Sequence, residues 1–331
     1  MRKSAVLKFR FFSFFILFFN LSIFSYVNIS GIYTTNQTWG RYSPAADGIY
    51  VVTGDITVYQ GATITIEPGV IIKFSASRQI TLGAGTGAIF NAQGTASEPI
   101  IFTSLKDDIR DDTNGDGNNS SPSPGDWSRI SFASGATGVF EYCEFRYGGG
   151  NPTYPYVIRC NAGAPTQFTN CSIIYSSSNG LDCSQAGYAP STISGSVFSN
   201  INGWPIKILP SDFPVISNSN NFSSNLNNGI YLYSQNIPAN VYNWQNPGIP
   251  LFASGSITIN AGATVNLSPG TILKFNSGSA FTVSGILNAY GTSGSRIAFT
   301  SYKDDSLGGD TNGDGASSAS PGDWYYMIVN S

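Results

Sequence analysis

The sequence contains an internal duplication, and this feature restricts the possible folds most strongly. Ile56–Phe74 (ITVYQGATITIEPGVIIKF) recurs as Ile257–Phe275 (ITINAGATVNLSPGTILKF). Further along, Lys106–Gly117 recurs as Lys303–Gly315 with one extra residue, and the tetrapeptide Pro-Gly-Asp-Trp follows both copies. Self-similarity with small insertions indicates a structural unit that has been duplicated.

Apolar and polar residues alternate within each copy. Ile56 and Val58 point one way, while Thr57 and Tyr59 point the other, and Gly or Pro-Gly interrupts the pattern every few residues. A period of two predicts short strands separated by tight turns. Only 11% of the residues are charged, against a usual value of about 25%. This composition disfavours coiled coils and long helical bundles, and the 41% of apolar residues disfavour a disordered chain.

Short strand motifs also recur through the middle of the chain at intervals of 25 to 28 residues. They are Phe140–Phe145, Phe168–Ile173, Ile193–Phe198 and Ser219–Ser224. Two architectures fit such a series, an antiparallel sandwich or a solenoid of parallel strands. The uniform spacing favours the solenoid, because a coil of about 25 residues cannot bury its apolar face alone and must stack on its neighbours. About 12 coils are expected.

The motifs resemble those of bacterial secreted right-handed parallel β-helix proteins, often described as pectin-lyase-like. The resemblance rests on Trp39, the run Tyr50-Val51-Val52, the GATITIEPG segment, Lys73-Phe74 and the KDD…TNGDG loop with its PGDW ending. It implies an all-β, right-handed parallel β-helix with two long Asp-rich excursions. Most members of this family have no assigned activity. After an N-terminal segment, the chain is expected to consist of an entry segment (31–55), the first unit with the middle coils (56–246) and the second unit (247–331).

The N-terminus has the pattern of a signal peptide, expected over residues 1–30. Four basic residues precede a largely apolar run, Phe11–Phe24, which is shorter than a typical bilayer span. Processing is expected between Ser25 and Gly31, and an uncleaved membrane anchor is the alternative. Cleavage predicts a secreted or cell-surface protein without a transmembrane span. It also leaves 12 of the 16 basic residues against 19 acidic ones, without a basic patch, so nucleic acid is not an expected partner.

Eleven of the 19 carboxylates fall in the two Asp-rich excursions. In both, Asp-Thr-Asn-Gly-Asp-Gly places oxygen side chains at positions 1, 3 and 5 and Gly at 6, as in the first half of a calcium loop. Position 12 is Ser123 or Pro321 rather than Glu, so no EF-hand is expected. A metal-free Asp/Asn turn is the alternative, but the repeated pattern favours a structural Ca²⁺ in each excursion. The predicted ligands are Asp107, Asp108, Asp112, Asn114, Asp116 and Asp126, and then Asp304, Asp305, Asp310, Asn312, Asp314 and Asp323.

The four cysteines fall in neighbouring coils. Stacked positions lie about 4.8 Å apart, which a disulfide tolerates in Cα separation. If bridges form after export, the expected pairs are Cys143–Cys171 and Cys160–Cys183. The alternative is four buried thiols that pack as small apolar groups.

The sequence offers no convincing catalytic constellation. It has no His, which excludes a Ser-His-Asp triad and a His base. Glu141 and Glu144 are expected on one strand but on opposite faces, and a pair of carboxylates must flank the bond in most glycosidases. The arginines that a lyase could use as a base, Arg129, Arg146 and Arg159, are poor bases because they stay charged.

The leading hypothesis is therefore a non-catalytic extracellular β-helix, stabilised by calcium, that presents a long polar surface for adhesion or for contact with a polysaccharide or cell-surface glycan. The alternative is a calcium-dependent polysaccharide lyase or glycoside hydrolase. Ice or mineral binding is a weak third, because the pair Thr63 and Thr65 is not repeated as two threonines. Trp127 and Trp324 are expected to cover the core rather than to bind sugar. The chain stops soon after Trp324, which suggests that further coils follow in a longer protein.

Overall fold

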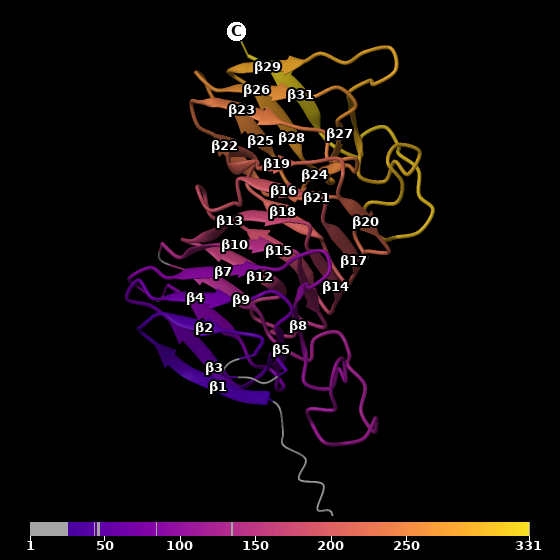
Figure 1. Cartoon of the computed structure of the whole chain (residues 1–331). Helices are drawn as coiled ribbons and strands as arrows, with labels where there is room; N and C mark the ends of the chain where they lie inside the picture. The colour runs from indigo at the N-terminus through magenta and orange to yellow at the C-terminus, as the bar shows by residue number, and fades with distance from the viewer. Residues whose placement is uncertain (1–25, 43, 45–46, 84, 134, 331) are drawn as a thin grey trace, which may run out of the picture.

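The computed structural model describes residues 26–330 apart from 43, 45, 46, 84 and 134. It is an all-β solenoid of about 11 turns with about 25 residues per turn (Figure 1). Residues 1–25, most of the expected signal peptide, lie outside the described part. Residues 26–30 belong to β1 (Tyr26–Tyr33), which pairs with β3 (Ile49–Val58). Processing that leaves this first strand whole would therefore fall before Tyr26.

Three faces run along the solenoid in its first two thirds, and each turn contributes one strand to each face. Face 1 consists of the first half of β3 and of β5 (Ile71–Phe74), β8 (Ile100–Ser104), β11 (Cys143–Arg146), β14 (Ser172–Ser176), β17 (Val197–Ile201) and β20 (Asn221–Ser223). Face 2 consists of the second half of β3 and of β6 (Ile80–Leu82), β9 (Ile130–Ala133), β12 (Tyr156–Asn161), β15 (Asn179–Cys183), β18 (Ile206–Ile208), β21 (Ile230–Leu232), β24 (Leu251–Ala253), β27 (Ile272–Phe275) and β30 (Ala298–Ser301). Face 3 consists of β2 (Gln37–Trp39), β4 (Thr63–Ile66), β7 (Ile89–Gln93), β10 (Thr137–Glu141), β13 (Ala164–Thr169), β16 (Thr192–Ser194) and β19 (Val215–Ile216).

Two further sheets complete the C-terminal turns. One contains β22 (Gln235–Ile237), β25 (Ile257–Ile259), β28 (Ala280–Val283) and β31 (Tyr326–Val329). The other contains β23 (Val241–Trp244), β26 (Thr264–Leu267) and β29 (Ile286–Ala289). The strand pairings are parallel from β1 to β31, so the predicted solenoid is confirmed and the sandwich is excluded.

The core is a set of stacked apolar columns. On face 2, one inward position is occupied in successive turns by Ile80, Ile130, Ile158, Leu181, Ile206, Ile230, Leu251 and Leu273. None of these side chains is exposed. Burying one such side chain contributes about 1.5–3 kcal/mol, and parallel strands keep like residues in contact from turn to turn. The alternation in the sequence therefore fixes which residues face inward.

Several turns bend at single residues with positive φ. The segment Phe140–Phe145, expected as one strand, is divided between β10 and β11 at Tyr142 (φ 47°). Asn170 (φ 53°) and Gly195 (φ 60°) occupy the equivalent corners of the next two turns. The expectation that Glu141 and Glu144 share a strand was wrong, because this corner places them on faces 3 and 1. A Tyr at such a corner carries no sequence signal, since Gly and Asn are the residues that favour this conformation.

The second copy is stacked one face later than the first. The first half of β3 lies on face 1 and pairs with β5, but its duplicate, β24, pairs with β21 of face 2. In consequence β5 lies on face 1 and its duplicate β27 lies on face 2. Two long loops leave the solenoid after β8 and β30, and Figure 1 shows both projecting beyond the strands. We call residues 105–129 the first Asp loop and residues 302–325 the second Asp loop.

Candidate metal centres

A buried lysine lies beneath each Asp loop. Lys73 on β5 and Lys274 on β27 point outward from the core, yet neither is exposed. The Nζ of Lys73 donates to the Asp111 carbonyl oxygen at 2.6 Å, and the Nζ of Lys274 donates to the Gly309 carbonyl oxygen at 2.7 Å. Each loop thus folds back over the strand that carries its lysine. Burial lowers the pKa of both lysines, and the nearby Asp carboxylates partly offset this effect.

Three carboxylates converge in the second Asp loop. One oxygen from each of Asp305, Asp310 and Asp314 lies within 4.8 Å of the other two, and we call these residues the second Asp trio. Backbone N–H groups of Gly313 and Gly315 donate to the two oxygens of Asp310 at 2.7 and 3.0 Å, which fixes its position. The Oδ1 atoms of Asp305 and Asn312 are buried without a hydrogen-bond partner among the described residues. Such oxygens are costly unless a donor or a cation satisfies them.

The first Asp loop carries Asp108, Asp112 and Asp116 at the corresponding positions, and we call them the first Asp trio. Among the described residues, only the second Asp trio brings three carboxylate oxygens within 4.8 Å of one another. Burial raises the pKa of Asp108, and the charges of Asp112 and Asp116 raise it further. Its Oδ1 is buried without a hydrogen-bond partner in the part of the chain that the structure describes. Asp112 accepts from the N–H groups of Gly115 and Gly117, both at 2.8 Å. The duplicated sequence therefore forms the same Asx turn at Asp112 and at Asp310.

Four of the predicted ligands have other partners. Asp107 and Asp304 accept from Thr103 and Thr300 at 2.6 Å, which fixes the first turn of each loop. Asp126 binds the Nζ of Lys106 at 2.8 Å, and its second oxygen accepts from Ser104 at 2.7 Å. At the duplicated position, Asp323 lies 3.5 Å from Lys303.

Each predicted asparagine lies beside the Asp trio of its loop. Asn114 donates to Asp116 at 2.9 Å, and Asn312 donates to Asp314 at 2.8 Å. The structure therefore gathers Asp108, Asp112, Asn114 and Asp116 in one loop and Asp305, Asp310, Asn312 and Asp314 in the other. The buried lysines were not among the predicted site residues, although the recurrence of Lys-Phe at the end of both duplicated segments was visible in the sequence.

The two tryptophans close the loops against the core. Trp127 is fully buried, stacks on Phe74 with ring centroids 4.4 Å apart, and donates its Nε1 hydrogen to the Arg146 carbonyl oxygen. Trp324 stacks on Phe275 at 4.5 Å but is only half-buried. Both positions are those of core-covering residues.

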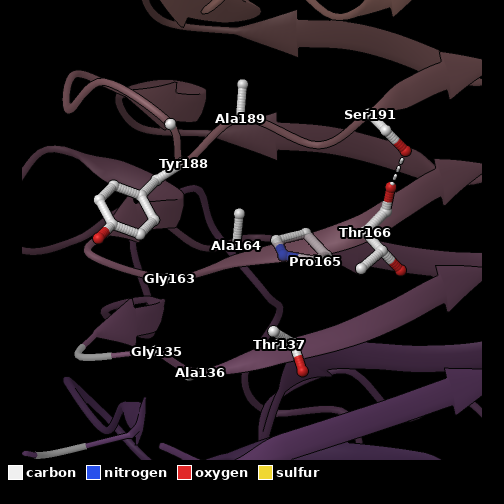
Figure 2. Close-up of a pocket in the computed structure, with 11 residues that line it drawn as sticks. Gly135, Ala136, Thr137, Gly163, Ala164, Pro165, Thr166, Tyr188, Ala189 and Ser191 are labelled. Carbon is white, nitrogen blue, oxygen red and sulfur yellow. Dashed lines mark hydrogen bonds between the residues drawn. The ribbon is translucent and has the colours of Figure 1, made fainter.

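A separate cavity of about 290 Å³ lies where the turns pass from face 2 to face 3. Figure 2 shows Ala136, Ala164 and Ala189 stacked along it, with the Tyr188 ring at one side. Its lining also contains Gly, Pro, Ser and Thr residues but no charged side chain. Tyr188 is the only titratable side chain among its described lining residues.

Residues 39–152 match the family model of a pectate-lyase-like β-helix domain. This segment is similar to pectate-lyase-like β-helix domains. The match confirms the resemblance that the sequence motifs indicate, and the parallel columns continue beyond residue 152 through β30. No curated protein and no solved structure matches the chain. Among the described residues, no helix is long and apolar enough to cross a membrane.

Proposed function

We propose that this protein is an exported or cell-surface β-helix in which each Asp loop binds one structural calcium ion. Its long outer surface would contact a polysaccharide or a cell-surface glycan without cleaving it. The observation that carries the calcium part is the second Asp trio, with the unpartnered oxygens of Asp305 and Asn312 beside it. The fold supports the saccharide part, since the matched family model is described as pectate-lyase-like and pectate is a polysaccharide.

The charges of the loops support a divalent cation. When ionised, the second Asp trio carries three negative charges and Lys274 one positive charge, which leaves a net charge of two negatives. A divalent ion would balance this charge. All the available ligand atoms are oxygens, which favours calcium over zinc. The bound ion would hold a long excursion against the solenoid.

A non-catalytic role is supported by an ion pair between the acid candidate and the base candidate on β11. Glu144 and Arg146 on β11 bind each other, and Arg146 also lies 3.9 Å from Asp107. The nearest acid and base candidates on this strand are therefore engaged with each other.

Calcium binding is tested by thermal unfolding and by isothermal titration of the full exported chain. Calcium at about 100 times its Kd should stabilise the fold by roughly 2.7 kcal/mol per site and raise the Tm by about 5 °C or more. Titration should give two ions per chain. The double variant Asp305→Asn/Asp310→Asn should bind one ion, and adding Asp108→Asn/Asp112→Asn should abolish binding.

Two control variants separate ligands from neighbouring acids. Asp47→Asn removes an exposed carboxylate outside the loops, and Asp323→Asn removes one that lies beside Lys303. Both should keep two bound ions. A Tm that does not respond to calcium or chelator, or equal binding by the trio variants, would reject the calcium part.

The non-catalytic part is tested by incubating the exported chain with uronic-acid polymers and neutral polysaccharides, with and without calcium. We expect no unsaturated product and no new reducing ends over many hours. Turnover of any of these polymers by the purified chain would replace the adhesion proposal with the lyase or hydrolase alternative.

A further inference from the structure

The outer side of face 2 carries a row of large polar and aromatic side chains. Parallel pairing places these residues in direct register, one per turn, as follows: Arg159, Asp182, Lys207, Tyr231 and Phe252. We call them the face-2 row. Adjacent strands lie about 4.8 Å apart, so neighbouring members of the row are close enough to interact.

The middle of the face-2 row is internally balanced. Asp182 is 2% exposed and accepts a hydrogen bond from the hydroxyl of Tyr233 at 2.7 Å. The Nζ of Lys207 lies 3.8 Å from the same carboxylate and 4.5 Å from the centroid of the Tyr231 ring. Among the described residues Asp182 forms its ion pair with Lys207 and none with its other neighbour in the row, Arg159, and its second oxygen is buried without a hydrogen-bond partner.

The N-terminal end of the row is not balanced. The guanidinium groups of Arg159 and of Arg129, which immediately precedes β9, form no hydrogen bond and no ion pair with any described residue. Both guanidinium groups lie against one ring, that of Tyr154, at 4.5 Å for Arg129 and 4.9 Å for Arg159. Arg129 is only 9% exposed. The closest acidic candidate on the preceding turn, Asp55, is bound by Arg78 and Gln79.

Two guanidinium groups beside one another, partly removed from water and without an anion, are an unfavourable arrangement unless a ligand completes it. Guanidinium matches the geometry of planar and tetrahedral oxyanions, and it forms stronger hydrogen bonds with them than neutral donors do. The whole chain has a net charge of −3, so general attraction of anions is not expected and a local site is required.

We propose that Arg129, Arg159 and Tyr154 bind an oxyanion on a sugar unit of the glycan, either a uronate carboxylate or a sulfate ester. This inference rests on the proposed contact with glycan and locates it on face 2. The charged group would lie on the two arginines, and the sugar ring would pack on the exposed edge of Tyr154.

Aromatic rings continue the surface toward the second Asp loop. Trp204 stacks on Phe252 with centroids 4.6 Å apart and meets Tyr231 at 5.3 Å. Thr311 of the second Asp loop lies against Gly229 beside Trp204, so the loop bounds this strip at its C-terminal end. Phe252 is only 6% exposed, so the half-buried rings of Trp204 and Tyr231 provide the positions for the neutral units that follow the charged one.

The test is direct binding by titration calorimetry with three oligosaccharides of equal length: a uronate oligomer, a sulfated oligomer and a neutral oligomer. The wild-type chain should bind one acidic oligomer at least tenfold more tightly than the neutral one, and the preferred acid identifies the oxyanion. Arg129→Gln and Arg159→Gln should each weaken that binding about tenfold. The double variant Arg129→Lys/Arg159→Lys should keep part of the binding, because lysine keeps the positive charge but lacks the forked set of donors of guanidinium.

The matched control is Arg296→Gln, which removes one exposed positive charge in the second unit and should leave binding unchanged. Circular dichroism and Tm verify that each variant is folded. Equal binding of neutral and acidic oligomers, or full binding by the Arg129 and Arg159 variants, overturns the site but leaves glycan contact in place. Absence of binding to all three oligomers overturns the site and the glycan part of the proposed function together. The calcium part is tested separately by calcium titration and is not affected by this result.

Discussion

At the scale of single residues, the duplicated tryptophans provide an internal comparison. Trp127 and Trp324 make the same stacking contact, but only Trp127 is covered completely by later turns. Trp127→Ala should lower the free energy of unfolding by about 3–5 kcal/mol, since it removes a fully buried ring. Trp324→Ala should cost clearly less. Urea denaturation of both variants measures the difference, and equal losses would contradict the assignment of Trp127 to the core.

Asp126 gives a pH dependence with a defined sign. Burial alone would raise the pKa of this carboxyl, but its bonds to Lys106, Ser123 and Ser104 outweigh burial and hold the pKa below its ordinary value. A depressed pKa contributes stability that is present above about pH 4 and is lost as the pH falls through the folded-state value. Asp126→Asn should therefore lower stability at pH 7 and make it less sensitive to pH between about 5 and 2. Asp47→Asn, at an exposed site, is the control, and an unchanged pH profile in Asp126→Asn would contradict this role.

At the scale of strands, the cysteines form two stacked pairs in the core. Cys143 and Cys171 lie one residue before the paired residues Glu144 and Ser172 of β11 and β14. Cys160 and Cys183 lie one residue after the paired residues Arg159 and Asp182 of β12 and β15. All four are free and buried in the structure, and burial next to a second thiol raises the pKa of Cys143 and Cys183 well above the ordinary value. Because thiolates are the reactive form, the native chain should react with no thiol reagent, and guanidinium should expose four thiols. Fewer than four after unfolding would indicate that bridges form on export.

The strand architecture was predictable because the period of two and the coil length are both written in the sequence. The motifs Phe140–Phe145 and Phe168–Ile173, for example, were expected to stack, and Phe140 pairs with Phe168 while Phe145 pairs with Ile173. The corner at Tyr142 and the stacking of β24 on β21 were not predictable, since each depends on packing between turns rather than on local preference. In the Asp loops, residue spacing singled out Asp310 and Asp314 of the second Asp trio, whereas Asp305 was included only as one of several flanking carboxylates. The spacing did not distinguish the trio members from Asp107 and Asp126, because Thr103 and Lys106 become the partners of these two residues only when the loop folds back.

At the scale of the whole molecule, strand pairing joins each turn only to the turns before and after it, and a few side-chain contacts, such as that of Tyr233 with Asp182, reach two turns. Stability in such a solenoid is a sum of local terms and nearest-neighbour terms, so damage should stay local. Ile193 on β16 is fully buried and pairs with Phe168 on one side and with Ile216 on the other. Its replacement by Ala should cost about 2–5 kcal/mol, concentrated in the turns around it.

Hydrogen exchange measured by mass spectrometry can follow this loss turn by turn. In Ile193→Ala, amides from β13 to β20 should exchange faster, whereas those of β4–β8 and β25–β28 should keep their protection, because they lie several turns away. Val215→Ala, on the neighbouring β19 but 47% exposed, should leave all three regions unchanged. A uniform increase along the chain would mean that the solenoid unfolds as one cooperative unit. The calcium-bound loops would then stabilise distant turns as strongly as their own, so chelation should accelerate exchange everywhere.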